Sequence, residues 1–338
     1  MKTLRLYIFV SVLGLLLSSN AFSQTSLNGA GSTFVYPIMS KWTSEYHKLH
    51  PEIEINYQSI GSGGGIRQVS EGTVDFGASD GPMTDGQLAS AKVGKILHVP
   101  LVMGADVPAY NIPGISQELR FTPELLAGIF LGRITTWNDP EIAKANPGVN
   151  LPNQSIIVVH RSDGSGTTYI WTDYLSKVSK EWESSVGRGS SVKWPVGLGG
   201  KGNEGVAGMV RQMPGSIGYV ELIYAQQNKI PYGPVRNSAG NFVAASIESV
   251  TTAAASVKIP ADYRYSITNT SGKDAYPISG TTWALLPEHS RDANKGKILV
   301  DFIQWVITDG QGMAPDLHYS KLPTDLVPRL QASLKTVQ

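Results

Sequence analysis

The sequence of 338 residues predicts an α/β fold, on three observations. Apolar segments of strand length alternate with helical patterns along most of the chain, which is typical of α/β sheets. Glycine- and hydroxyl-rich segments stand between several of these strands and the helices that follow. The length is sufficient for two ordinary domains. Because ligands of α/β proteins bind at the carboxyl ends of strands, the glycine-rich segments are the first candidates for a site.

Strands are predicted where apolar residues alternate or run continuously over a few positions. Residues 53–57 alternate with a period of two and lead into a glycine-rich segment. Residues 156–160 form a continuous apolar run, which is typical of a buried strand. The other predicted strands cover residues 74–79, 96–103, 217–220 and 283–286.

Helices are predicted from apolar residues that recur on one side of a helical period. Residues 37–48 place Ile38, Met39, Trp42 and Tyr46 on one side. Residues 166–178 begin within a glycine- and threonine-rich segment. The other predicted helices cover residues 122–130, 205–213 and 295–308.

Residues 1–23 are predicted to be a signal peptide rather than part of the fold. Lys2 and Arg5 precede an apolar stretch, and Ala21 to Ser23 resembles a small-residue cleavage site. The stretch is shorter than the ~20 residues of a membrane helix, which makes the alternative of an uncleaved anchor less favourable. No cysteine follows it, so a lipid anchor on an amino-terminal cysteine is excluded.

Composition excludes several classes of partner. Removal of Lys2 and Arg5 with the signal peptide changes the formal net charge from +1 to −1, and no basic tract remains. Nucleic acid and anionic membrane surfaces are therefore not expected partners. An exported chain without cysteine has no disulfides, so its stability must come from a hydrophobic core.

Three segments combine glycine with serine or threonine: residues 29–34, 61–65 and 161–168. Glycines let the backbone approach a ligand, and the first turn of a helix has N–H groups without intrahelical partners. Together with the helix dipole, these groups favour an anion. Convergence of the three segments would surround a small oxyanion. Each segment alone also has a plain interpretation, as a flexible turn, a helix cap or core.

Arg161 stands at the end of the buried strand predicted over residues 156–160, where a guanidinium needs a partner. Asp163 could hold it and leave the other edge of the guanidinium for an oxyanion. The alternative is an ordinary ion pair that fixes a turn.

Asp80 places a carboxylate at the end of another apolar strand, where a helix cap is the alternative explanation. If Asp80 faces the anion, Coulomb repulsion excludes a guest without a proton between them. Hydrogen phosphate carries such a proton at neutral pH and sulfate does not. A carboxylate acceptor would therefore select phosphate, and sites of this kind can discriminate by roughly 10⁴-fold or more.

These segments, read together, resemble the periplasmic phosphate-binding proteins of bacterial ABC phosphate transporters, the PstS family. The matching segments are GAGSTF at 29–34, GSGGG at 61–65, VDFGASD at 74–80, RSDGSGT at 161–167, VKWPVGLGGKGN at 192–203 and GSIGYVE at 215–221. The resemblance covers essentially the whole mature chain. It implies a two-lobed periplasmic binding protein of type II, with mixed sheets flanked by helices and a ligand cleft between the lobes. Lobe I would comprise residues 24–108 and 264–338, and lobe II residues 109–263.

The resemblance also implies a phosphate site, a periplasmic location and a partner. One lobe would contribute Thr33, the main-chain N–H of Phe34, Ser62 and Asp80. Asp80 would accept the proton of the phosphate. The other lobe would contribute Arg161, Ser165, Gly166 and Thr167, and Asp163 would orient the arginine. His160 departs from the family pattern, which has a second arginine there, and we expect a small change in local field. The protein would act as a monomer without metal or cofactor. Its closed form would dock on the permease of an ABC transporter with cytoplasmic ATPase subunits.

Two other functions remain open from the sequence. A phosphatase or other hydrolase is suggested by Ser165, but the G-x-S-x-G spacing is absent and the six histidines show no metal-ligand spacing. A binding protein for another oxyanion, such as sulfate or molybdate, is the second alternative. Residues 197–203 are predicted to be exposed near the rim of a lobe, in contact with the permease or as a solvated turn.

Overall fold

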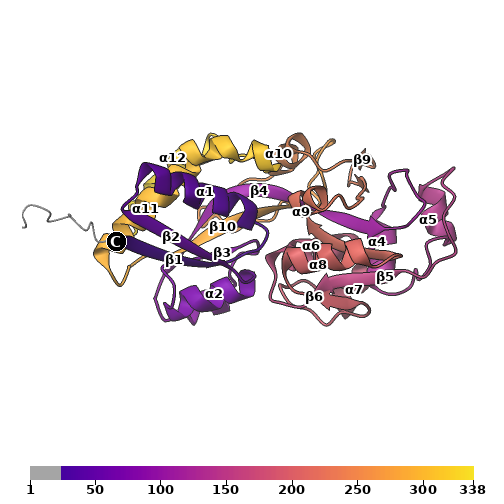
Figure 1. The fold of residues 1–338 in the computed structure, drawn as a ribbon, viewed down its shortest axis with the longest axis horizontal. Helices are drawn as coiled ribbons and strands as arrows, with labels where there is room; N and C mark the ends of the chain where they lie inside the picture. Colours follow the sequence, from indigo (N-terminus) through magenta and orange to yellow (C-terminus); the bar gives the residue numbers. More distant parts are fainter. Residues whose placement is uncertain (1–23) are drawn as a thin grey trace, which may run out of the picture.

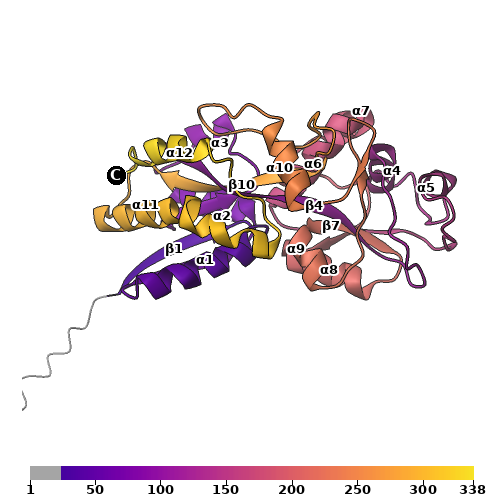
Figure 2. The same ribbon diagram turned by 90° about the horizontal axis from the view of Figure 1, so that it is seen from above.

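The computed structural model describes residues 24–338, so the predicted signal peptide lies outside the described residues. Figure 1 shows two lobes arranged along the longest axis of the molecule, and Figure 2 shows the same division from above. The strands form one eight-stranded sheet in the order β2-β1-β3-β10-β4-β7-β5-β6. In chain order these strands are β1 (Thr25–Gly31), β2 (Ile53–Ser59), β3 (Phe76–Ser79), β4 (Ile96–Asn111), β5 (Ile157–Arg161), β6 (Leu198–Gly200), β7 (Ser216–Glu221) and β10 (Ser279–Pro287).

Strand β4 connects the lobes. Its first part, up to Ala105, pairs antiparallel with β10, and its second part, from Asp106 to Asn111, pairs antiparallel with β7. One crossing between the lobes therefore lies inside a continuous strand. Figure 1 shows β4 extending from one lobe into the other, and β10 returning the chain to the first lobe. The predicted lobe limits at 108/109 and 263/264 stay a prediction.

Helices surround both parts of the sheet. In chain order the helices are α1 (Tyr36–Leu49), α2 (Ser62–Glu71), α3 (Asp85–Ala89), α4 (Pro123–Phe130), α5 (Pro140–Ala145), α6 (Gly166–Val178), α7 (Lys180–Ser185), α8 (Gly202–Gln212), α9 (Leu222–Gln227), α10 (Ile247–Ala255), α11 (Ala293–Ile307) and α12 (Leu326–Leu334), with the 3₁₀ turns η1 (Asp309–Met313) and η2 (Pro315–Leu317). The short strands β8 (Val235–Arg236) and β9 (Phe242–Val243) form a separate pair. Large aromatic side chains, among them Trp42, Phe76, Trp137 and Trp171, are buried in the hydrophobic core. Between residues 24 and 338, none of the helices has the length and apolar character needed to span a membrane.

The α/β prediction is confirmed, and each predicted strand and helix corresponds to an observed one. The structure also contains helices and short strands that the sequence does not predict: α3, α5, α7, α9, α10, α12, β6, β8 and β9. Three further differences concern β1, β4 and α2. Strand β1 was not predicted, because its glycines and Asn28 weaken the strand pattern. Strand β4 continues beyond Met103 through Asp106 and Pro108, which interrupt the apolar run. Helix α2 begins at Ser62, so residues 62–65 form its first turn rather than a loop before it.

The glycines of α2 let the helix backbone touch the sheet directly. A Cβ on Gly65 would lie 2.6 Å from Ala30 O and 2.6 Å from Gly31 Cα in β1. A side chain larger than hydrogen would therefore separate the helix from the strand. This contact holds the first turn of α2 at the carboxyl ends of β1 and β3, where the site is predicted.

We expect Gly65→Ala to destabilise the protein by about 1–3 kcal/mol, because the added methyl group meets backbone atoms that have no space to move. Gly208→Ala in α8 is the matched control. A Cβ at Gly208 meets nothing within 4 Å, and we expect this variant to be more stable by about 0.4–1 kcal/mol. Urea unfolding measures both values. A Gly65→Ala protein as stable as the wild type would contradict the close backbone contact.

Candidate anion-binding site

The predicted site residues come together at the carboxyl ends of strands from both lobes. Thr33 and Phe34 follow β1, Ser62 begins α2, and Asp80 follows β3. From lobe II, Arg161 ends β5, and Ser165, Gly166 and Thr167 form the N-cap and first turn of α6. All eight residues are buried. That they bind an anion stays a prediction.

The Asp80 carboxylate is held by hydroxyl groups from three elements. Its Oδ1 accepts hydrogen bonds from Ser32 Oγ at 2.5 Å and from Thr282 Oγ1 at 2.6 Å, and its Oδ2 accepts one from Ser62 Oγ at 3.3 Å. Burial raises the pKa of Asp80 to about 6, although these hydroxyls and the charge of Arg161 lower it. Asp80 does not cap the next helix, because Thr84 caps α3. The alternative of a helix cap is therefore wrong.

Oδ2 of Asp80 faces the opposite lobe. A Cβ built on Gly166 would collide with Asp80 Oδ2 and would lie 2.5 Å from Ser62 Oγ. Only a glycine at this position lets the first turn of α6 approach the carboxylate. Ser165 Oγ caps the helix by accepting the N–H of Thr168 at 3.0 Å. The earlier N–H groups of that turn have no intrahelical acceptor and carry the positive end of the helix dipole.

Arg161 is fixed by Asp163, as predicted from their spacing. Nε donates to Oδ1 at 2.8 Å and Nη2 to Oδ2 at 2.5 Å, so the carboxylate occupies one edge of the guanidinium. Asp163 Oδ1 also accepts the N–H of Gly202 at 3.0 Å. Burial raises the pKa of Asp163, but the hydrogen bonds and charge of Arg161 outweigh burial and hold that pKa below its ordinary value. The remaining edge of the guanidinium points to Thr167, whose Oγ1 accepts from Nη1 at 3.1 Å.

The sequence did not identify three side chains of the site: Ser32, Thr282 and Asn203. Ser32 adjoins a predicted residue, but Thr282 lies in β10, which only the sheet order brings beside β3. Asn203 was assigned to an exposed segment. Gly197, Leu198 and Gly199 are exposed, whereas Asn203 is fully buried, so the prediction is wrong for the end of that segment.

His160 lies on the other face of β5 from Arg161, since successive strand residues alternate. Its ring stacks on Trp194 with centroids 4.8 Å apart and an interplanar angle of 11°. Its Nδ1 lies 3.0 Å from Arg161 O. Burial lowers the pKa of His160, which favours the neutral ring. The expected small effect on the local field stays a prediction.

Two further carboxyl groups are buried where β4 crosses between the lobes. Asp106 and Glu221 are direct cross-strand partners on β4 and β7, and both are fully buried. Within residues 24–338, Oδ1 and Oδ2 of Asp106 and Oε1 of Glu221 have no hydrogen-bond partner. Burial first, and then the nearby charge of Asp80, raise the pKa of both groups well above the ordinary range. Both groups therefore favour the protonated form.

The raised pKa values predict a pH dependence of stability. A folded state that binds more protons than the unfolded state is most stable below the ordinary carboxyl pKa of about 4 and loses stability as pH rises. For Asp80 this stability is lost between pH of about 4 and pH of about 6, and for Asp106 the loss extends to higher pH.

The free energy of unfolding, measured in urea without ligand, should decline from pH 5 to pH 9. We expect Asp106→Asn to make this decline less steep. The exposed Asp274→Asn should leave the slope unchanged, and an equal slope for Asp106→Asn would contradict the assignment.

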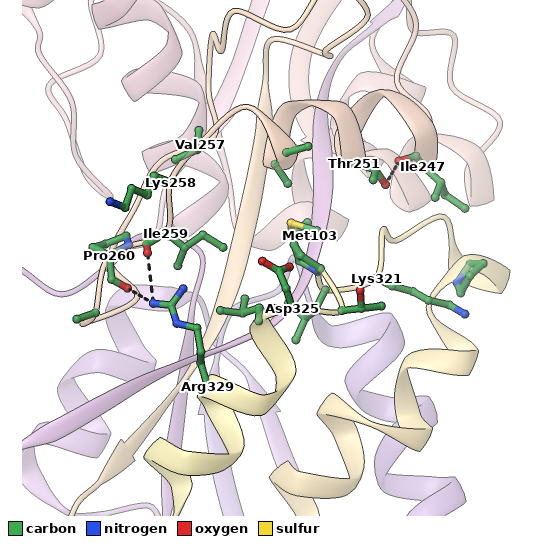
Figure 3. Close-up of a pocket in the computed structure, with 18 residues that line it drawn as sticks. Met103, Ile247, Thr251, Val257, Lys258, Ile259, Pro260, Lys321, Asp325 and Arg329 are labelled. Carbon is green, nitrogen blue, oxygen red and sulfur yellow. Dashed lines mark hydrogen bonds between the residues drawn. The ribbon is translucent and has the colours of Figure 1, made fainter.

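A cavity lies apart from these residues. It has a volume of about 960 Å³ and is bordered by α10, residues 257–261 and the start of α12. Figure 3 shows Arg329 in its wall, donating to Ile259 O at 3.3 Å and Pro260 O at 3.1 Å. None of the predicted site residues lines it, and most of its surface is apolar.

In the part of the chain that the structure describes, no group of three or more His, Asp or Glu side chains is arranged to hold a metal ion.

The fold and the site define the class of protein. Residues 18–310 match the family model described as the PBP superfamily domain. The solved structure of a high affinity periplasmic phosphate-binding protein bound with phosphate at pH 8.5 has a TM-score of 0.73 to this chain, at 23% identity, over 91% of this chain and 94% of that one. At this identity the likeness shows the fold alone, and it confirms the predicted two-lobed architecture.

Relatives closer in sequence identify the family. The phosphate-binding protein PstS of Xylella fastidiosa (strain Temecula1) is 47% identical over 318 residues, covering 93% of this chain and 86% of the relative. PstS of Pasteurella multocida (strain Pm70) is 47% identical over 314 residues, covering 92% of this chain and 90% of the relative. The chain belongs to the PstS family of phosphate-binding proteins.

Proposed function

We propose that this chain binds inorganic phosphate between its lobes, in the periplasm, and delivers it to the membrane permease of an ABC transporter for import. One observation carries the proposal: Asp80 is a buried carboxylate that faces the first turn of α6 and lies in the field of Arg161. In the proposed site, hydrogen-bond donors surround one acceptor, the carboxylate of Asp80. This arrangement matches a tetrahedral anion that retains one proton. The names of the relatives support the same ligand.

Thr33, Phe34 and Ser62 are the proposed ligand residues of lobe I. The carbonyl groups of Thr33 and Phe34 accept hydrogen bonds from the hydroxyls of Tyr224 and Tyr319, each at 2.5 Å. These two bonds fix the orientation of the peptide planes that follow Thr33 and Phe34. Since N–H and C=O point in opposite directions in a peptide plane, the N–H of Phe34 is directed away from Tyr224 and is available to the anion.

Arg161, Ser165, Gly166 and Thr167 are the proposed ligand residues of lobe II. The lobes touch in this conformation, where Gly63 N donates to Gly164 O at 2.8 Å. Closure excludes water and strengthens each hydrogen bond to the ligand. Because both lobes contribute contacts, the anion binds the closed form more tightly than an open one and shifts the population toward it.

Hydrolysis is the less favourable alternative. Ser165 Oγ is engaged in capping α6. His160 lies on the face of β5 opposite to Arg161 and stacks on Trp194. The relatives are named as binding proteins. Turnover of a chromogenic phosphate ester that Ser165→Ala abolishes would overturn the binding proposal. A monomer that acts without cofactor is part of the proposal, and size-exclusion chromatography with light scattering tests the oligomeric state.

Calorimetry at pH 7 should show tight binding of phosphate and negligible binding of sulfate by the wild type. In Asp80→Asn the amide oxygen must stay on the donors Ser32 and Thr282, so the NH₂ group takes the place of Oδ2. We expect phosphate affinity to change by no more than about tenfold and sulfate binding to increase, because the acceptor has become a donor. The exposed Asp274→Asn is the control. Equal affinity of the wild type for both anions would end the phosphate proposal.

Arg161→Ala should weaken phosphate binding by about 2–5 kcal/mol, because it removes a buried, charge-assisted donor and leaves Asp163 unpaired. Arg211→Ala, at an exposed position of α8, is the matched control and should bind as the wild type does. Titration of both variants with phosphate measures the difference. Binding within twofold of the wild type after loss of Arg161 would remove that residue from the site.

A further inference from the structure

Asn203 links the two lobes through its side chain. It lies in the first turn of α8 and is fully buried. Its Nδ2 donates to Thr33 Oγ1 of lobe I at 2.9 Å and to Thr167 Oγ1 of lobe II at 3.0 Å. Its main-chain N–H also donates to Thr33 Oγ1, at 3.2 Å. One amide group therefore contacts both proposed threonine ligands.

The orientation of this amide is determined by its surroundings. The N–H of Glu221 lies 2.9 Å from Oδ1, and a main-chain N–H only donates. Oδ1 must face Glu221, so the two hydrogens of Nδ2 point to the threonine hydroxyls. A flipped amide would place a donor against a donor in a fully buried position, which is unfavourable.

Each threonine hydroxyl has one proton and two lone pairs. Thr33 Oγ1 accepts two hydrogen bonds from Asn203, and Thr167 Oγ1 accepts one from Asn203 and one from Arg161 Nη1. Between residues 24 and 338, neither hydroxyl donates to a protein acceptor. With both lone pairs occupied, the proton of each hydroxyl is left for another acceptor.

We propose that Asn203 is a positioning residue that makes the hydroxyls of Thr33 and Thr167 obligatory donors toward the anion, and that it ties the lobes together when they close. The inference rests on the proposed phosphate function. It assigns the threonines to unprotonated phosphate oxygens and leaves Asp80 as the acceptor for the protonated one. Without Asn203, each hydroxyl can rotate and accept a proton, so the preference for the dianion weakens.

The first test measures phosphate affinity by calorimetry across pH 5.5 to 8. We expect Asn203→Ala to lower affinity at pH 8 about tenfold or more, and clearly less at pH 5.5, where the singly charged anion predominates. A merely structural role would lower affinity by the same factor at both values. Asn203→Asp replaces two donors with acceptors and should reduce affinity further at pH 8, because the threonine hydroxyls then donate to the new carboxylate.

A double-mutant cycle tests whether Asn203 acts through Thr33. Thr33→Val removes the hydroxyl and keeps the shape. We expect the loss from Thr33→Val to be at least about threefold smaller in the Asn203→Ala background than in the wild type. Ser62→Ala is the matched control, since Ser62 contacts Asp80 rather than Asn203, and its effect should multiply with that of Asn203→Ala.

The outcomes separate the two proposals. A wild type that binds no phosphate overturns the proposed function. A wild type that binds phosphate, with multiplicative effects of Asn203→Ala and Thr33→Val and an equal loss at both pH values, overturns only the role of Asn203. If Asn203→Ala does not fold, Asn203→Ser, which keeps a polar atom beside Glu221, replaces it with the same expected pattern.

Discussion

The rest of the site depends on the burial of the Asp80 carboxylate. A buried carboxylate must be hydrogen-bonded, and the sheet order supplies its partners. Strand β3 lies between β1 and β10, with Gly31 opposite Ala78 and Trp283 opposite Ser79. One step along β10, Thr282 therefore lies opposite Asp80, and Ser32, the residue after β1, donates to the same carboxylate oxygen. Asp80 has all of its hydroxyl partners only when β10 lies beside β3, so the sheet order completes the surroundings of this carboxylate.

The crossing strand β4 explains how two lobes can share one small site. β4 pairs with β10 up to Ala105 and with β7 from Asp106 on, so one continuous strand joins the two parts of the sheet. Gly104, two residues earlier, leaves space for the Phe34 ring, which a Cβ there would approach to 2.7 Å. The buried carboxyl groups of Asp106 and Glu221 lie at the same point. Their raised pKa values favour the protonated form, in which neither group adds a negative charge beside Asp80.

The sequence predicts the local parts of this arrangement well. The buried run of β5, the arginine at its end and the Ser-Gly-Thr helix start are contiguous, so the Arg161–Asp163 pair and the first turn of α6 follow from spacing alone. The partners of Asp80 do not, because Thr282 is some two hundred residues away in sequence. Asn203 follows several glycines, which are typical of an exposed loop. Helix α8 begins at Gly202, however, and Asn203 is buried in its first turn. The sequence does not predict the crossing inside β4 either, because Asp106 and Pro108 are residue types that are common in loops. The lobe limits and the ligand role of each site residue were supplied by the family resemblance.

The anion selectivity of the proposed site depends more on which groups donate and which accept hydrogen bonds than on the net charge of the site. Arg161 is the cation of the site, and Asp163 already occupies one edge of it, so attraction by charge alone is modest. Sulfate and hydrogen phosphate carry the same charge and shape, and a more basic cleft would bind both. In the proposed site, a fixed set of donors with one fixed acceptor would distinguish them, because only a guest with a proton satisfies Asp80 Oδ2 without leaving a buried charge unpaired. The orientation of each hydroxyl then matters as much as its presence. The amide of Asn203 sets two of those orientations through bonds that are complete only when both lobes are together.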